Sequence, residues 1–123
     1  MAHMLPRVYE NWLEVPGPVV QTIWLDRPAW FVWLDVPTTT RFAYPLFDPR
    51  CGYSVGVMSV RKEQRQRGGW YWSAYRRAGA QLRKHYLGRS ATLTHARLAA
   101  VATWMLAQTA STGGLPTSEM SQS

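Results

Sequence analysis

The feature that most constrains the fold of this chain is a glycine turn between two runs that are typical of β-strands. The runs "WYWSAYRR" (70–77) and "AQLRKHYLG" (80–88) flank Ala78-Gly79, a pattern that predicts a β-hairpin. Successive side chains of a strand point to opposite faces, so a one-residue slip in the pairing inverts every side chain. The register of this hairpin therefore decides which of its residues face a core.

We expect a three-residue loop, Arg77-Ala78-Gly79, with Gly79 left-handed as a bulge. A two-residue loop would instead place Leu82 on the face of Tyr75 and mix the two faces. The longer loop places Ala74 opposite Leu82, Trp72 opposite Lys84 and Trp70 opposite Tyr86, which form an apolar face. The other face then collects Tyr71, Ser73, Tyr75, Arg83 and His85.

An earlier pair of runs predicts a first hairpin. "RFAYPLF" (41–47) and "YSVGVMSVRKE" (53–63) are separated by "DPRCG", whose Asp-Pro and Gly are typical of a turn. Pro45 suits an edge strand because proline cannot donate to a sheet ladder.

Two helices are expected around these strands. "DRPAWFVWLDVP" (26–37) has Pro28 in its first turn, and its apolar Trp30, Phe31 and Leu34 are interpreted as core. A later helix begins after Thr94, a good N-cap. Its apolar stripe recurs at i, i+3, i+4 and i+7 and can lie across the sheet. The residues of this stripe are Leu98, Val101, Ala102 and Met105.

The predicted fold class is α+β, with a three- or four-stranded antiparallel β-sheet packed against a C-terminal α-helix and a short upstream aromatic helix. Residues 26–108 are expected to form this single domain. Residues 1–3 look like an expression scar, and residues 4–25, interrupted by Pro16, Gly17 and Pro18, are interpreted as an extended N-terminal arm. Residues 109–123 are small and polar, so we expect a disordered tail or linker.

Charge is segregated along the chain. Residues 61–97 carry ten of the fourteen Lys and Arg residues and a single acid, Glu63. The net charge of this block is +9, and that of the whole chain is +7. Such a block usually marks a polyanionic partner, nucleic acid before an anionic membrane surface. The other interpretation is a solvated face that keeps the protein soluble.

The residue patterns of enzymes and metal proteins are missing from the sequence. Cys51 is the single cysteine, and His85, His95 and the scattered carboxylates lack ligand spacing. There is no phosphate-binding glycine motif and no "GxSxG". We therefore expect no enzyme activity, no cofactor and no metal, and no small-molecule ligand is indicated. No apolar run approaches the roughly 20 residues that span a bilayer, and the lone cysteine fits a cytoplasmic location.

Candidate nucleic-acid contacts fall within the basic block. Arg83 and His85 on the presumed outer face are the favoured base contacts. Arg76 and Arg77 at the hairpin tip either probe a groove or are solvated charges. Arg89 is either a phosphate anchor or a solvated charge. The whole set is Arg61, Lys62, Arg65, Arg67, Tyr71, Ser73, Tyr75, Arg76, Arg77, Arg83, Lys84, His85 and Arg89, in which Arg61, Arg65, Arg67 and Lys84 are expected to meet phosphates.

The run "VRKEQRQRGGWYWSAYRRAGAQLRKHYLGRSATLTHARLAAVA", with "PAWFVWLD" upstream, resembles an N-terminal module of large LuxR-type, ATP-dependent transcriptional regulators of Chloroflexi-like bacteria. The order of strand, "WY-A-YR", glycine turn, basic strand and helix is also similar to the arm-type DNA-binding domain of tyrosine recombinases. That similarity implies a three-stranded sheet packed on a C-terminal helix, whose outer face enters the major groove of DNA.

From the residues and the resemblance we expect a DNA-binding domain that uses the basic-aromatic face of its sheet on double-stranded DNA, in transcription regulation or recombination. One alternative is a protein-interaction module that docks a partner or the other domains of a larger regulator. Another is single-strand or RNA binding through stacking on Tyr71 and Tyr75.

Overall fold

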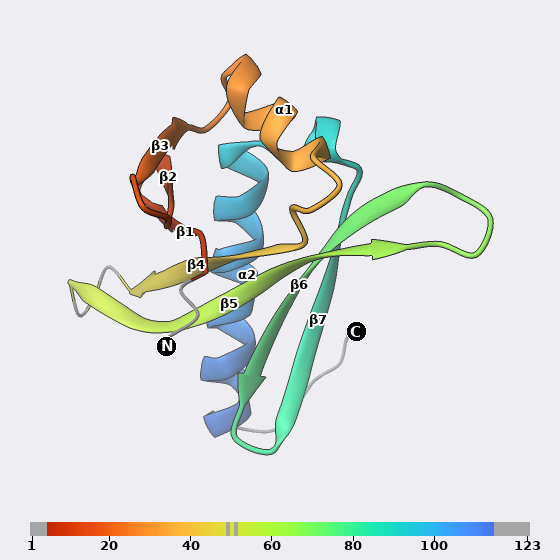
Figure 1. Cartoon of the computed structure of the whole chain (residues 1–123). Helices are drawn as coiled ribbons and strands as arrows, with labels where there is room; N and C mark the ends of the chain where they lie inside the picture. Colours follow the sequence, from red (N-terminus) through yellow and green to blue (C-terminus); the bar gives the residue numbers. More distant parts are fainter. Residues whose placement is uncertain (1–4, 49, 51, 115–123) are drawn as a thin grey trace.

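The computed structural model describes residues 5–48, 50 and 52–114 (Figure 1). The expected scar at 1–3 and the end of the expected tail, 115–123, lie outside the described residues. The strands are β1 (Arg7–Tyr9), β2 (Trp12–Val15), β3 (Gln21–Trp24), β4 (Arg41–Asp48), β5 (Tyr53–Gln64), β6 (Trp70–Ala78) and β7 (Gln81–Gly88). The helices are α1 (Pro28–Asp35), the 3-10 turn η1 (Ser90–Thr92) and α2 (His95–Gly114), so that α2 runs past the expected domain end at 108.

The expected three- or four-stranded antiparallel sheet is wrong, although the fold is α+β. One seven-stranded mixed sheet runs in the order β3-β2-β1-β4-β5-β6-β7, with β1 and β4 parallel and all other neighbours antiparallel. The three extra strands come from residues 7–24, which were expected to be an arm. Pro16, Gly17 and Pro18 lie in the loop between β2 and β3 and do not interrupt a strand.

The join between the two parts of the sheet is short. β1 and β4 share one register pair, Arg7 with Ala43, and the Ala43 N–H donates to the Pro6 carbonyl at 2.8 Å. Pro45 lies two residues further along β4, so its nitrogen also points away from β5. The missing N–H therefore costs no ladder bond, although β4 is not an edge strand.

The β6–β7 hairpin is present, but its predicted register is wrong. Ala78 pairs with Gln81, so the loop has two residues and begins at Gly79. Gly79 has the expected left-handed backbone, with φ of 63°, and takes the first loop position as glycine does in type II′ turns. Ala74 consequently lies opposite His85 instead of Leu82.

The prediction failed because burial covers only part of the hairpin. Trp72 and Ala74 are fully buried, whereas Leu82, which was assigned to the apolar face, is 50% exposed. Near the tip neither face is buried, so polarity does not set the register there. A β-bulge beside Trp72 then shifts the pairing register by one residue. As a result, the Leu87 side chain is buried in the core.

Both predicted helices are confirmed. Pro28 begins α1 at its first turn, and Trp30 and Leu34 are fully buried. The Trp30 indole N–H donates to the Leu93 carbonyl at 2.7 Å and joins α1 to the start of α2. Thr94 caps α2 by accepting a 3.2 Å hydrogen bond from the Arg97 N–H. The predicted stripe of α2 is buried in the core: Leu98, Val101, Ala102 and Met105.

Helix α2 covers one face of the sheet and contacts β4, β6 and β7 (Figure 1). We call this side the helix face, and we call the opposite side of β5, β6 and β7 the open face. Within the described part of the chain, neither helix combines the length and the apolar character that a membrane crossing requires.

Candidate nucleic-acid interface

The open face is set by the pairing of β5, β6 and β7. Directly opposed residues share a face, so the pairs Arg61–Ser73 and Tyr75–Lys84 lie on one side of the sheet. The buried Trp72 and Ala74 then mark the other side. The residues of the open face are Ser59, Arg61, Glu63, Tyr71, Ser73, Tyr75, Arg77, Leu82, Lys84 and Tyr86.

Glu63 lies on the open face, near the end of β5. Its carboxylate accepts a hydrogen bond from the Tyr75 hydroxyl, and its Oε1 lies 3.5 Å from the Lys84 Nζ. One residue from each strand therefore meets here. The acid that the sequence places inside the basic block is held by its neighbours and does not project from the surface.

The ionisation of this cluster follows from those contacts. Burial raises the pKa of Glu63, but the hydrogen bond from Tyr75 and the charge of Lys84 outweigh burial, so the pKa lies below its ordinary value of 4.5. Burial, followed by the bond to Glu63, raises the pKa of Tyr75. Hydrogen bonding with Tyr75, which outweighs burial, raises the pKa of Lys84. At neutral pH the cluster therefore holds a carboxylate, a neutral phenol and an ammonium group.

Cations lie over the aromatic rings of the open face. The Arg61 guanidinium is 4.5 Å from the centroid of the Tyr75 ring, and the Lys84 ammonium is 5.4 Å from the same centroid. Arg65 lies 5.0 Å from the Tyr71 ring and 5.3 Å from the Tyr86 ring. Such contacts hold a long basic side chain in place while its outer surface stays in water.

Tyr86 was assigned to the core side by the sequence, yet it belongs to this cluster. It is 45% exposed, and its hydroxyl accepts a 2.9 Å hydrogen bond from Arg65. Its ring lies 5.5 Å from that of Tyr71. Arg41 was also missed, because only the β4–β5 pairing places it directly opposite Arg61. The correct hairpin registers would have identified both residues.

Two predicted contacts, Arg83 and His85, are not on the face expected for them. Arg83 pairs with Arg76 and His85 with Ala74, so all four belong to the helix face. The His85 ring lies 4.8 Å from the ring of Trp104 on α2. The pairing therefore separates Arg83 and His85 from Tyr71 and Tyr75, and the cause is the two-residue turn.

Lys62 and Ser73 are also not exposed on the open face. Lys62 lies on the helix face, and its Nζ donates to the Val36 carbonyl at 3.1 Å. Burial, opposed by the charge of Asp35, lowers the pKa of Lys62. Ser73 belongs to the open face but is fully buried, beneath its neighbours. Neither side chain is presented to a ligand in this arrangement.

The remaining candidates lie at the ends of the open face. Arg67 is exposed in the β5–β6 loop, and Arg89 is exposed with its guanidinium close to Gly69 of the same loop. Arg77 is exposed beside the β6–β7 turn. The open face thus carries cations from one hairpin end to the other.

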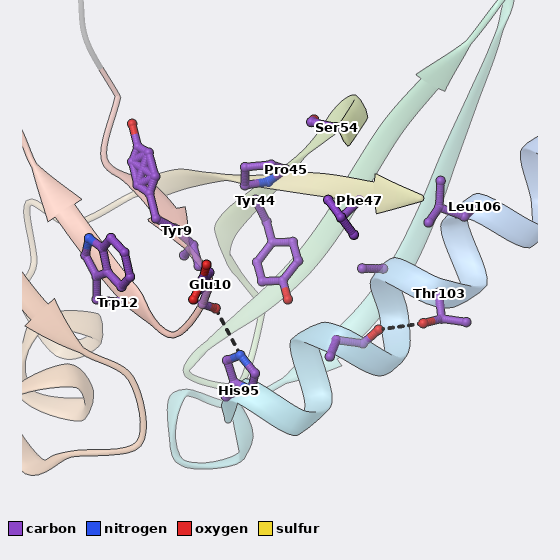
Figure 2. Close-up of a pocket in the computed structure, with 13 residues that line it drawn as sticks. Tyr9, Glu10, Trp12, Tyr44, Pro45, Phe47, Ser54, His95, Thr103 and Leu106 are labelled. Atoms are coloured by element: carbon purple, nitrogen blue, oxygen red, sulfur yellow. Dashed lines mark hydrogen bonds between the residues drawn. The ribbon is translucent and has the colours of Figure 1, made fainter. Parts of the chain in front are cut away.

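An apolar groove of about 690 Å³ lies between the β1–β2 turn, β4 and α2 (Figure 2). Tyr9, Trp12 and Tyr44 line it, and burial raises the pKa of Tyr44. At one end the His95 Nε2 lies 3.0 Å from the Glu10 carbonyl oxygen. This groove was not predictable from the sequence, because residues of the expected arm form one of its walls.

Among the described residues, no group of three or more His, Cys, Asp or Glu side chains is placed to hold a metal ion. Comparisons with protein-family models, curated proteins and solved structures find no match.

Proposed function

We propose that the chain binds double-stranded DNA through the open face of β5, β6 and β7. The observation that carries the proposal is the pairing that gathers Arg61, Tyr75 and Lys84 on one face, with Arg65 and Arg77 toward opposite ends of β6. Phosphate backbones are bound by such spread cations, and a β-ribbon fits the major groove of B-form DNA. A cytoplasmic location is proposed with this function, since a single cysteine fits a reducing compartment.

The cation contacts give each basic side chain a role. Arg61 and Lys84 both lie against the Tyr75 ring and are proposed phosphate contacts. Arg65 and Arg77 lie toward opposite ends of β6, where they can follow the strands of the duplex. Arg41 on β4 extends the same face.

Duplex DNA is favoured over single strands because the tyrosine rings already have partners. Arg61 and Lys84 both lie against the Tyr75 ring, and Arg65 lies against those of Tyr71 and Tyr86. A base that stacked on these rings would have to displace a cation. The strands β5, β6 and β7 followed by α2 also have the order that the resemblance to arm-type domains implies. Transcription regulation or recombination is the process proposed on that resemblance.

The competing function is a protein-interaction module, and the specific observation behind it is the apolar groove of Figure 2. Phe47 lines this groove and is 57% exposed. The two functions use different parts of the molecule, so substitutions separate them. Phe47→Ser should leave DNA affinity unchanged if the open face binds DNA.

Fluorescence anisotropy with labelled duplex DNA, single-stranded DNA and RNA, over a series of salt concentrations, tests the proposal. The duplex should bind tightest. The slope of log K against log salt should become more negative by about 0.9 for each phosphate contacted. No duplex binding at low salt, or a flat slope, would remove the proposal. Tighter binding of single strands, lost in a Tyr71→Ala and Tyr75→Ala double variant, would favour stacking.

A further inference from the structure

Strand β3 forms one edge of the sheet and is exposed. It pairs with β2 alone, and in Figure 1 it lies at the margin of the molecule. Val20, just before it, is 58% exposed, and Trp24 at its end is 51% exposed. No described residue pairs with the outer side of this strand.

The backbone groups that face outward follow from the β2–β3 pairing. The Leu25 N–H donates to the Asn11 carbonyl at 3.0 Å, so Leu25, Ile23 and Gln21 direct their backbone groups toward β2. The alternate residues Trp24, Thr22 and Val20 therefore direct theirs away from the sheet. These groups are free to pair with another strand.

The edge lacks most of the features that usually prevent such pairing. Proteins protect exposed edges with very short strands, charged side chains, proline within the strand or a covering element. Residues 19–25, "VVQTIWL", contain no charge and no proline. The β3 edge is short, which limits pairing, but it carries neither charge nor proline and has Val20 and Trp24 exposed at its ends.

We propose that β3 pairs with β3 of a second copy of this chain, antiparallel about a two-fold axis at Thr22. In this register the two residue numbers of each pair add to 44. Thr22 lies opposite Thr22 of the second copy, and Val20 lies opposite Trp24 on both sides of the axis. All three outward-facing residues then pair, and shifting the register by two residues leaves some of them without a partner.

Side chains support the same register. Tyr9, Trp12 and Trp24 form a row across β1, β2 and β3, with ring centroids 6.0 and 5.7 Å apart. Pairing places Val20 of the second copy beside Trp24, so the row continues across the axis. Aromatic and β-branched pairs are among the favourable cross-strand neighbours.

Charge favours a second copy over a nucleic acid at this edge. Between Arg7 and Arg27 the chain has no Lys or Arg, and its acids in this stretch are few. The basic block lies on β5, β6 and β7, toward the opposite edge of the sheet. Two copies can therefore meet at β3 without bringing their basic faces together.

Site-directed cross-linking of the full chain tests the register, in a background where Cys51→Ser removes the lone native thiol. Gln21 and Ile23 of opposite copies would form a non-hydrogen-bonded pair with Cα atoms about 4.5 Å apart, within reach of a disulfide. A mixture of Gln21→Cys and Ile23→Cys proteins should give cross-linked dimers on oxidation. Gln21→Cys alone should not, since its two copies would be ~8 Å apart. Cross-links from either protein alone, but not from the mixture, would overturn this register.

Analytical ultracentrifugation over a range of concentrations tests the dimer itself. Thr22→Pro removes an outward N–H that takes no part in the β2 ladder, so the fold should persist, as checked by circular dichroism. It should raise the dimer dissociation constant by at least about tenfold, because two hydrogen bonds per dimer are lost. Thr22→Val, which keeps the N–H, should dimerise like the unaltered chain. A monomer at every concentration, with no cross-link in the mixture, would overturn the proposal.

Discussion

Replacing Glu63 by Gln should move stability and DNA affinity in opposite directions. Glu63 accepts a hydrogen bond from Tyr75 and pairs with Lys84 at 3.5 Å. The Gln amide oxygen can still accept from Tyr75, so the main loss is the ion pair. The side chains of Lys84 and Glu63 are 50% and 26% exposed, and such a pair contributes about 0.2–1 kcal/mol. A fall in Tm of roughly 1–4 °C is expected for a chain of this size.

The same change should strengthen DNA binding, because Glu63 is the one acid among the residues assigned to the open face. Lys84 is already a proposed phosphate contact, so the slope of log K against log salt should stay the same. Removing the competing ion pair, which contributes about 0.2–1 kcal/mol, should tighten binding by up to about fivefold. Thermal unfolding by circular dichroism and anisotropy titrations measure the two effects.

The pH dependence of the stability effect follows from the lowered pKa of Glu63. The pKa of Glu63 is lowered in the folded protein, so its stabilisation is fully present above the unfolded-state pKa. The stabilisation disappears as the pH falls through the lowered, folded-state pKa. The difference in stability between the unaltered chain and Glu63→Gln should therefore vanish in acid.

The matched control is Glu14→Gln, which removes the same charge from β2, away from the open face. It should alter neither the affinity nor the salt slope beyond a small general effect. If Glu63→Gln binds DNA more weakly, or if Glu14→Gln strengthens binding equally, the role assigned to the open face is wrong.

Two further changes test the fold. Trp30→Phe removes the donor of the buried 2.7 Å bond to Leu93 and should lower the free energy of unfolding in urea by about 2–4 kcal/mol. Gly88→Ala should cost more than Gly79→Ala in the same measurement. Both glycines have positive φ, but a Cβ on Gly88 would lie 2.8 Å from the Thr92 Oγ1, whereas Gly79 has open space. Strain alone should cost roughly 1–2 kcal/mol at Gly79, and equal losses would contradict this placement of Gly88.

Local signals in the sequence predicted the separate elements well. Pro28 and Thr94 mark the starts of α1 and α2 correctly, because proline in the first turn and a hydroxyl cap are short-range features. The turn glycine Gly79 likewise has the predicted left-handed backbone. These features depend on neighbouring residues alone.

Long-range pairing was not predictable in the same way. Strand β1 is three residues long and pairs with β4 through one register pair, so no local sequence pattern predicts it. The faces of β6 and β7 were misassigned because the turn, and not polarity, sets the register near the tip. For that reason Arg83 and His85 lie on the helix face and Tyr86 lies on the open face, opposite to the prediction.

The central claim is that the open face, and not the overall charge, binds DNA. The most direct measurement compares two double variants that each remove two positive charges from the same hairpins. Arg61→Gln with Lys84→Gln alters the open face, and Arg76→Gln with Arg83→Gln alters the helix face. Circular dichroism first verifies that both fold.

Anisotropy titrations with duplex DNA over a salt series then give the slope of log K against log salt for each variant. The open-face variant should lose about 1.8 from the magnitude of the slope, since each phosphate contact contributes about 0.9. The helix-face variant should keep the slope of the unaltered chain. Equal losses in both variants, or a larger loss in the helix-face variant, would contradict the account.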